Sequence, residues 1–360
     1  MTDGMPKRYL ELDVLRGLAA VAVLLFHYTT RYQELYGHPG GMPLTFPNGI
    51  CGVYLFFIIS GFVIFMTLER TKAPLDFLVS RASRLYPVYW VSVILTYAVV
   101  SLFGLPGMEV SFRDAFLNLS MCHGWAGIPS VDGVYWTLGV ELKFYLLMFA
   151  LFSLRTLRRT ELVMGIWLAL ALGIPWLKGL LPPIVYKGLF AMLLPEYANL
   201  FAAGILFYRL KTVGSSPTRH FLIAACAAGH LAVRGAEHFA LASPAFVLFY
   251  LFVGGRLAFL SWRPLVFLGA ISYPLYLTHE NIGFVILRGL YYLSSSSLLA
   301  VSIAAVAALS LASLLTFFVE QPSMRAIRTA YKRLQARRSA VSTLSSPQLR
   351  PAEGTECRGA

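Results

Sequence analysis

Charged residues are scarce in this chain. Aspartate, glutamate, lysine and arginine together make up 13% of the 360 residues, about half of the roughly 25% that is typical of soluble proteins. Apolar residues of the AVILMFWYC set make up 58%. A soluble domain of this size has too little interior to enclose so much apolar surface. The composition therefore excludes a water-soluble protein and predicts an all-α protein that crosses a membrane many times.

Cysteine is also rare, and acidic residues are fewer than basic ones. The four cysteines form no CxxC pair and show no metal-like spacing with histidine, so we expect neither a disulfide framework nor a metal site. The 30 basic and 17 acidic residues give a formal net charge of +13. In a soluble chain this excess would suggest a nucleic-acid partner. In a membrane protein it follows from cytoplasmic loops rich in lysine and arginine, so no nucleic acid is expected.

Ten segments approach the length of about 20 mostly apolar residues that a spanning helix needs. They are Leu10–Thr30, Ile50–Leu68, Leu85–Gly104, Val134–Leu154, Glu161–Leu177, Gly188–Tyr208, Thr218–Val233, His238–Gly255, Pro264–Leu290 and Ser297–Glu320. No small-residue cleavage site follows the first apolar run, so we expect a retained helix rather than a signal peptide. Of the 30 lysines and arginines, 22 fall in segments on one side of these spans and six on the other. This bias predicts about ten helices in a cytoplasmic (inner) membrane, with both termini in the cytoplasm.

The same pattern divides the chain into a transmembrane domain, residues 1–322, and a basic cytoplasmic tail, residues 323–360. The tail begins as a basic amphipathic stretch from Arg325 to Arg338 and then becomes rich in serine, proline and glycine. We expect it to be disordered, with its basic part against anionic lipid. The longest outer segment, Leu105–Gly133, is a candidate cover for a site.

Ionisable residues within spans are costly and mark candidate functional sites. Arg16 and His27 lie 11 residues apart, which places them on one stripe of the first helix about 16 Å apart. Snorkelling and a satisfied buried imidazole are the structural alternatives for this pair. Glu141 and Tyr145 lie one helical turn apart, and Lys143 points elsewhere, which favours a functional role for Glu141.

Three further groups have a structural and a functional interpretation. Ser272, Tyr276 and His279 share one face of the ninth span, either as interfacial anchors or as part of a site. Arg81 and Arg84 precede Pro87 at a cytoplasmic helix start, as topological anchors or as a phosphate clamp. Ser60 lies in a Phe-Phe-Ile-Ile-Ser-Gly-Phe segment typical of close helix packing, and the absence of a G-x-S-x-G motif gives no support to serine-hydrolase chemistry.

Taken together, these motifs resemble the acyltransferase-3 family of integral membrane O-acyltransferases, over roughly residues 8–323. The resemblance rests on Leu12-Asp13-Val-Leu-Arg16-Gly17 with His27, Gly52-Val-x-x-Phe-Phe57-x-x-Ser60-Gly61-Phe62, Arg81-x-x-Arg84-x-x-Pro87-x-x-Trp90, Trp136-Thr-Leu-x-x-Glu141-x-x-Phe-Tyr145, Gly269-x-x-Ser272-Tyr273-x-x-Tyr276-Leu-x-His279 and Val319-Glu320-x-Pro322. The chain departs from the family at Thr137, where serine is usual, and after His279, where a proline is often near but Glu280 and Asn281 follow. Because the tail from Ser323 onward has 38 residues, we expect the minimal form without an appended esterase-like domain.

The resemblance implies that His27 and Arg16 are essential to acyl transfer and that Arg81 and Arg84 help to hold a cytoplasmic acyl-CoA. We assign His27, Arg16 and Glu141 to catalysis on this basis. The candidate donor- and substrate-binding residues are Arg81, Arg84, Ser60, Trp136, Tyr145, Tyr276 and His279.

Acyl transfer to a hydroxyl needs a base, an oxyanion stabiliser and a thiolate that can leave. His27 suits the role of base, and it equally suits that of acyl carrier in a double displacement. We expect acyl-CoA, acetyl-CoA in the first place, as a donor substrate rather than a bound cofactor, with a sugar, surface polysaccharide or glycolipid as acceptor. The competing hypothesis is a sugar or lipid transporter or flippase without chemistry. The other family of membrane O-acyltransferases fits less well, because its Asn…His pattern is missing.

Overall fold

The computed structural model describes residues 9–293 and 296–345, with side chains to residue 337. These residues form helices and no strand. The main helices are α1 (Leu10–Leu25), α2 (Tyr32–Leu35), α3 (Cys51–Glu69), α4 (Pro74–Phe103), α5 (Phe112–Asn118), α6 (Trp136–Ser153), α7 (Thr160–Gly173), α8 (Pro183–Leu193), α9 (Ala198–Val213), α10 (Pro217–Val253), α11 (Arg263–Thr278), α12 (Glu280–Tyr291), α13 (Ser297–Leu315) and α14 (Gln321–Ser345). A π-helix, Phe26–Arg31, joins α1 to α2, and another, Thr316–Glu320, joins α13 to α14.

Seven helical segments of the described chain are long and apolar enough to cross a membrane, which confirms the all-α membrane class. The expected seventh and eighth spans appear as the single element α10, which is broken at Gly235 by φ 82° and ψ 174°. His220 Nδ1 lies 3.2 Å from the Tyr250 hydroxyl, although a straight helix would place residues 30 apart about 45 Å away from each other. The two halves of α10 therefore fold back on each other as a hairpin.

The first and ninth expected spans are interrupted. The first passes from α1 into the π-helix, and the ninth is divided at His279 into α11 and α12. Neither reaches the length and composition of the seven segments. The count of ten helices and the inward orientation of both termini therefore stay predictions.

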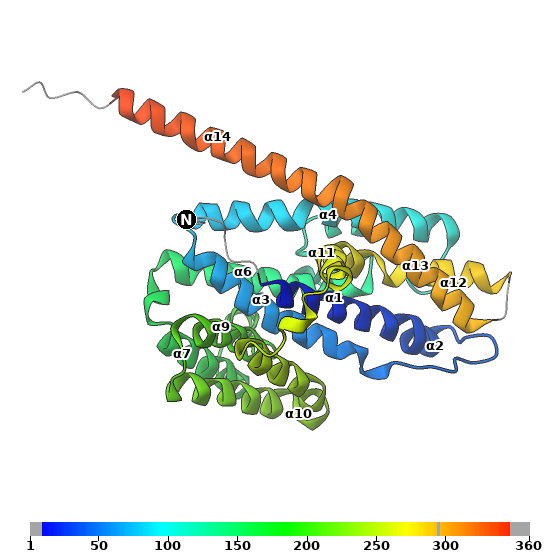
Figure 1. The fold of residues 1–360 in the computed structure, drawn as a ribbon, viewed down its shortest axis with the longest axis horizontal. Coiled ribbons are helices and arrows are strands. Elements are labelled where there is room, and N and C mark those ends of the chain that lie inside the picture. Colours follow the sequence, from blue (N-terminus) through cyan, green and yellow to red (C-terminus); the bar gives the residue numbers. More distant parts are fainter. Residues whose placement is uncertain (1–8, 294–295, 346–360) are drawn as a thin grey trace, which may run out of the picture.

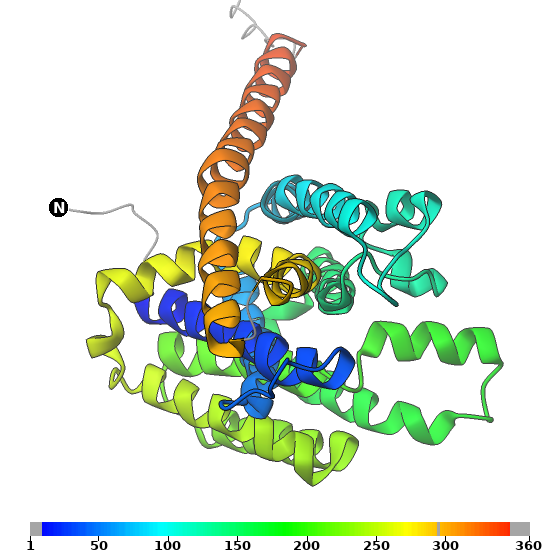
Figure 2. The ribbon, with the colours of Figure 1, turned by 90° about the vertical axis from the view of Figure 1, so that its right-hand side faces the viewer.

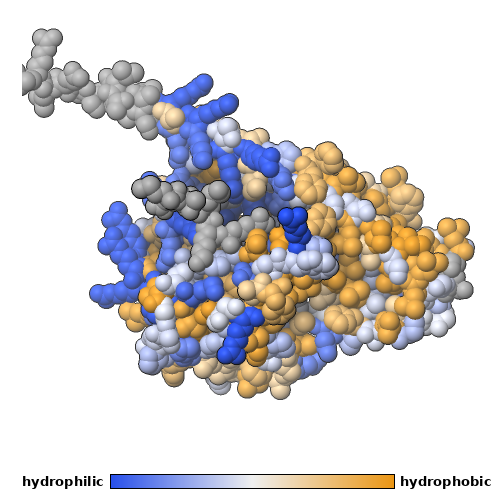
Figure 3. All heavy atoms as spheres, in the orientation of Figure 1, coloured by the Kyte–Doolittle hydropathy of each residue, from blue (hydrophilic) through white to orange (hydrophobic). Residues whose placement is uncertain are grey.

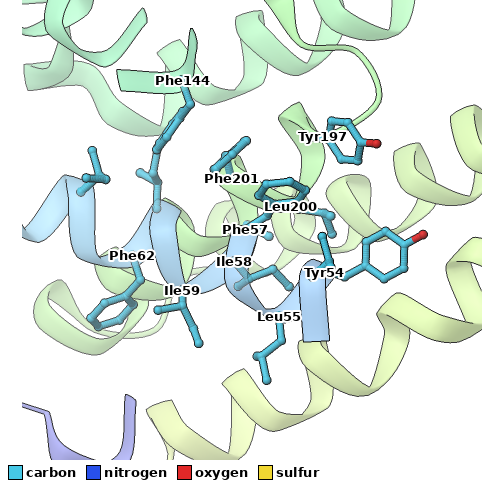
Figure 4. Packing of buried hydrophobic residues seen from close by; sticks show 14 of the residues in the cluster. Tyr54, Leu55, Phe57, Ile58, Ile59, Phe62, Phe144, Tyr197, Leu200 and Phe201 are labelled. Carbon is cyan, nitrogen blue, oxygen red and sulfur yellow. The ribbon is translucent and has the colours of Figure 1, made fainter. Parts of the chain in front are cut away.

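Glycines allow the central helices to approach closely, as small residues do in membrane bundles. A Cβ atom on Gly61 of α3 would overlap the Phe201 carbonyl of α9, and one on Gly17 of α1 would lie 2.6 Å from the Gly269 nitrogen of α11. Figure 4 shows α3 side chains packed among those of α9, where Phe201 stacks on Phe144 of α6 at 4.1 Å. The expected packing role of the Ser60-Gly61 segment is confirmed.

Loop residues that lie far apart in the sequence meet at the two ends of the bundle. At one end, Tyr36 donates a hydrogen bond to the Pro106 carbonyl and Ser297 donates one to the Pro39 carbonyl, both at 3.0 Å. At the other end, Glu161 pairs with Arg219 at 2.8 Å. Hydrophilic residues gather at the end from which α14 projects, and hydrophobic residues cover much of the remaining face (Figure 3). We call the end with Tyr36 and Ser297 the loop end. We call the end with Glu161 and Arg219, from which α14 projects, the basic end.

Helix α14 corrects the expectation of a disordered tail. Residues 323–345 are helical and continue from α13 without a loop, and α14 extends beyond the bundle (Figure 1). Figure 2 shows it rising beside α4, while α1 is enclosed by other elements. Arg328 donates to the Ser83 hydroxyl at 3.2 Å, and Tyr331 donates to Asp76 at 2.8 Å. Lys7, Arg8 and tail residues 346–360, Cys357 among them, lie outside the described residues.

Candidate active site

A cavity inside the bundle collects polar side chains from five helices. Its empty volume is about 800 Å³. The polar and charged residues that line it are Arg16, Ser60, Arg81, Arg84, Thr137, Glu141, Tyr145, Ser272, Tyr273 and Tyr276. Seven of the ten predicted site residues are therefore brought together, although they come from α1, α3, α4, α6 and α11. Their roles stay predictions, because the structure shows position and not reaction.

Glu141 is held toward this cavity by two hydroxyl groups. Ser60 donates to Glu141 Oε1 at 2.7 Å, and Tyr145 donates to the same oxygen at 2.6 Å. The Tyr145 contact is the one-turn pairing expected from the sequence. Hydrogen bonds to a charged group are among the stronger ones in proteins, so Glu141 has a defined orientation in the cavity wall.

The arginines of the cavity are inside the protein rather than at its surface. Arg16 donates to the Ser272 hydroxyl at 3.1 Å and lies 3.7 Å from Asp13. Arg81 is buried, and its Nε atom has no hydrogen-bond partner. A side chain that only anchors a loop places its charged head in water. Buried guanidinium groups facing a cavity instead fit an anionic ligand, because their planar forks match phosphate and carboxylate oxygens.

A second cavity continues from the first toward the basic end. It has an empty volume of about 1180 Å³, and it shares Arg16, Val63 and Arg84 with the first. Its wall includes Gln321 and Arg325 of α14. We call the two adjoining cavities, which share these lining residues and are both lined by arginines, the passage.

His27 lies beyond the inner end of this passage, in the π-helix after α1. Its Nδ1 atom is 2.9 Å from the Val23 carbonyl and 3.1 Å from His279 Nε2. His279 Nδ1 is in turn 2.9 Å from the Tyr276 carbonyl. Carbonyl oxygens only accept, so we assign a hydrogen to both Nδ1 atoms and a lone pair to both Nε2 atoms. His27 Nε2 is therefore free to take a proton.

Two carboxylic acids that sequence reasoning did not select face this histidine. Glu280 Oε1 lies 3.6 Å from His27 Nε2, and the side chain of Glu280 is 8% exposed. Asp132 is fully buried and accepts hydrogen bonds from the backbone nitrogens of Val134 at 3.2 Å and Asn281 at 3.1 Å. Glu280 was visible in the sequence as a departure from the family pattern. Asp132, at the end of the outer segment, carried no signal of its own.

Aromatic rings separate His27 from the cavity. Tyr276 contacts Phe56 with ring centres 5.5 Å apart and His279 at 5.8 Å, and His279 contacts His27 at 4.9 Å. The Tyr276 hydroxyl is also 3.0 Å from Thr137 Oγ1. Phe56 and Tyr276 thus close the inner end of the passage.

Trp136 is the predicted site residue that lies apart from both groups. Its side chain is 44% exposed and packs against Phe57 and Tyr197. It lines neither cavity. Among residues 9–293 and 296–345, no group of three or more His, Cys, Asp or Glu side chains is arranged to hold a metal ion.

Comparison with known proteins defines the class. The acyltransferase domain profile of the acyltransferase-3 family matches residues 9–317. The chain therefore belongs to the acyltransferase-3 family.

Three curated relatives share parts of the sequence. The exopolysaccharide production protein ExoZ of Rhizobium meliloti (strain 1021) is 28% identical over 206 residues, which cover 46% of this chain and 64% of ExoZ. Nodulation protein 10 of Rhizobium leguminosarum bv. viciae is 28% identical over 38% of this chain and 42% of its own length. A putative acetyltransferase, ORF330, of Acidianus two-tailed virus is 27% identical over 43% of this chain and 44% of its own length. These alignments span less than two thirds of each relative, and no solved structure matches this chain.

Proposed function

We propose that this protein is an inner-membrane O-acyltransferase that moves an acyl group, acetyl in the first place, from cytoplasmic acyl-CoA to a hydroxyl of a sugar, surface polysaccharide or glycolipid. The observation that carries the proposal is the arginine-lined passage that leads from beneath α14 toward the His27–His279 pair. The names of two relatives, one linked to exopolysaccharide production and one to acetyl transfer, support the choice of substrate class.

The donor enters from the basic end in this proposal. The phosphates of coenzyme A are polyanionic, and Arg325, Arg84 and Arg16 follow one another along the two cavities. The pantetheine arm then extends along the apolar wall formed by Val53, Phe56 and neighbouring residues. For the thioester to reach His27, the Phe56–Tyr276 contact must open, so we propose that this pair is displaced by the bound donor.

Acyl transfer then uses the free Nε2 atom of His27. The acceptor hydroxyl gives its proton to Nε2 while its oxygen attacks the thioester carbonyl. The C–S bond breaks, and the departing thiolate takes the proton from the imidazolium to give free CoA. Such general base catalysis contributes about 10²- to 10⁴-fold to rate. The Val23 carbonyl and His279 Nε2 share the single hydrogen of His27 Nδ1, and this keeps His27 in the required tautomer.

The geometry favours His27 as a base over His27 as an acyl carrier. Glu280 Oε1 occupies the position 3.6 Å from Nε2, and an acyl group on Nε2 would have to enter that space. A hydroxyl that passes its proton to Nε2 approaches only to hydrogen-bond distance, about 2.8 Å, and needs less room than a covalently bound acyl group. Purified protein mixed with labelled acetyl-CoA and no acceptor should therefore accumulate no acyl-enzyme.

Release of free CoA by the purified protein tests the proposed function. The protein in detergent or nanodiscs is incubated with acetyl-CoA and a bacterial glycan or glycolipid extract, and the released thiol is measured together with acetylation of the extract by mass spectrometry. We expect acceptor-dependent thiol release from the wild type and none from His27→Asn. Glycan transport without any thiol release would overturn the proposal in favour of a transporter.

A further inference from the structure

The carboxyl groups of Glu280 and Asp132 form a buried acidic pair beside the base. Asp132 has no exposed surface, and Glu280 is 6% exposed as a residue. The two side chains are close enough for each to shift the pKa of the other, and a hydrogen bond between two carboxyl groups requires one of them to carry a proton. Glu280 Oε2 has no further hydrogen-bond donor among the described residues. Two acids in such a place are costly to bury.

The backbone around the pair is shaped to hold it. A Cβ atom on Gly133 would lie 2.8 Å from Glu280 Oε1 and 2.5 Å from Oε2, so a larger residue at position 133 would displace the carboxyl group from its present place. Asn281 donates its backbone N–H to Asp132 at 3.1 Å and its side-chain amide to the Val131 carbonyl at 2.9 Å. The start of α12 is thereby fastened to the end of the outer segment, and the pair is fixed relative to His27.

The pKa of Asp132 indicates which acid of the pair is protonated. Burial and the neighbouring Glu280 carboxylate raise this pKa well above its ordinary value, which favours Asp132 as the protonated partner. Glu280 Oε1 faces His27 Nε2 at 3.6 Å. The other titratable or charged groups that interact electrostatically with the pair are Arg31, Tyr28, Tyr36, Tyr135 and Tyr276, and His279 lies against His27.

We propose that Glu280 is a positioning residue for His27, whose carboxylate stabilises the imidazolium that forms during acyl transfer, and that Asp132 holds Glu280 in place by donating a hydrogen bond to it. The inference rests on the proposed function, because it assigns a role within that reaction. When His27 Nε2 takes the hydroxyl proton, the new N–H points at Glu280 and forms a charge-assisted hydrogen bond. When the thiolate takes that proton, the bond is lost and the pair returns to its first state.

Two isosteric variants separate this role from a structural one. Glu280→Gln removes the negative charge, so the imidazolium loses its partner. We expect kcat to fall about 10- to 100-fold, the range for loss of one hydrogen bond to a charged group, with the KM for acetyl-CoA unchanged. The acidic limb of the pH–rate profile should move to lower pH, because His27 then holds a proton less readily. Asp132→Asn keeps a side-chain N–H donor toward Glu280 but loses one of the two backbone hydrogen bonds that Asp132 accepts. We therefore expect less folded protein, with kcat per folded protein within about threefold of wild type and an unmoved limb.

The matched control is Glu237→Gln, which alters an exposed glutamate of α10 and should leave rate and pH profile unchanged. If both Glu280→Gln and Asp132→Asn lower the amount of folded protein equally while the pH profile stays unmoved, the pair is structural and the inference is overturned. A wild-type rate in Glu280→Gln also overturns it, while the proposed function stands. Absence of thiol release from the wild type would instead refute the proposed function itself.

Discussion

Replacement of His27 by asparagine and by glutamine tests the proposed base most sharply. The two amides imitate different halves of the imidazole. Asparagine places its amide near Nδ1, where it is able to donate to the Val23 carbonyl, as His27 Nδ1 does at 2.9 Å. Glutamine reaches the position of Nε2, but an amide does not accept a proton near neutral pH. Both variants should insert and fold, and neither should act as a base.

The expected magnitudes differ between activity and stability. Loss of the general base should lower kcat by about 10²- to 10⁴-fold, which corresponds to about 3–5 kcal/mol of barrier. His27→Ala also loses the bond to Val23, worth ~1 kcal/mol. It loses ring contacts to Phe26 at 5.1 Å and His279 at 4.9 Å, worth ~0.5–1.5 kcal/mol each. We therefore expect alanine to be about 2–4 kcal/mol less stable, and asparagine to retain more of the wild-type stability.

The assay measures CoA thiol release and membrane-inserted protein in parallel. Rates are normalised to the amount of folded protein, taken from size-exclusion chromatography of a fluorescent fusion. A glutamine variant with near-wild-type acylation would refute the reasoning, because it would show that no proton needs to reach this position. His279 would then be the next residue to test.

Three further predictions concern the passage and the bundle. Replacing both Arg81 and Arg84 with glutamine should raise the KM for acetyl-CoA at least tenfold, since hydrogen bonds to charged groups are worth ~1.5–3 kcal/mol each. An unchanged KM would show that the two arginines serve only as topological anchors. Arg325→Gln should raise the same KM severalfold, whereas Arg333→Gln on the exposed side of α14 should not. Equal effects of the two variants on the KM would show only a general loss of positive charge. Gly61→Val should sharply lower the yield of folded protein, because its side chain would overlap the α9 backbone; a wild-type melting temperature would contradict the close packing.

The sequence predicted the class of this protein because hydropathy and charge act locally. A helix in lipid needs an apolar run of fixed length and satisfies its own backbone hydrogen bonds, so the all-α membrane class and most spans are readable residue by residue. Pairings within one helix were readable for the same reason. Glu141 and Tyr145 are one turn apart in the sequence and share a hydrogen bond in the structure.

The sequence was less informative where helix geometry departs from the regular form. The π-helix at Phe26–Arg31 and the bend at His279 interrupt two expected spans, and both interruptions lie at the histidine pair. Residues 323–345, which were expected to be disordered, form a helix in the structure, and Arg328 and Tyr331 of this helix find partners on α4. Such partners lie more than 240 residues away in the chain, and composition alone carries no information about them.

What the sequence by itself determined is the membrane class, the family motifs and the set of polar residues that lipid cannot accommodate. Only the tertiary structure decided which of these residues meet. It placed seven of them around one cavity, brought His279 of α11–α12 onto His27, and set Trp136 apart. It also brought Asp132 and Glu280, 148 residues apart in the chain, into one pair beside the base. The physical reason is that helix formation depends on neighbours in the sequence, whereas a buried polar group is stabilised by whichever partner the packing of distant helices supplies.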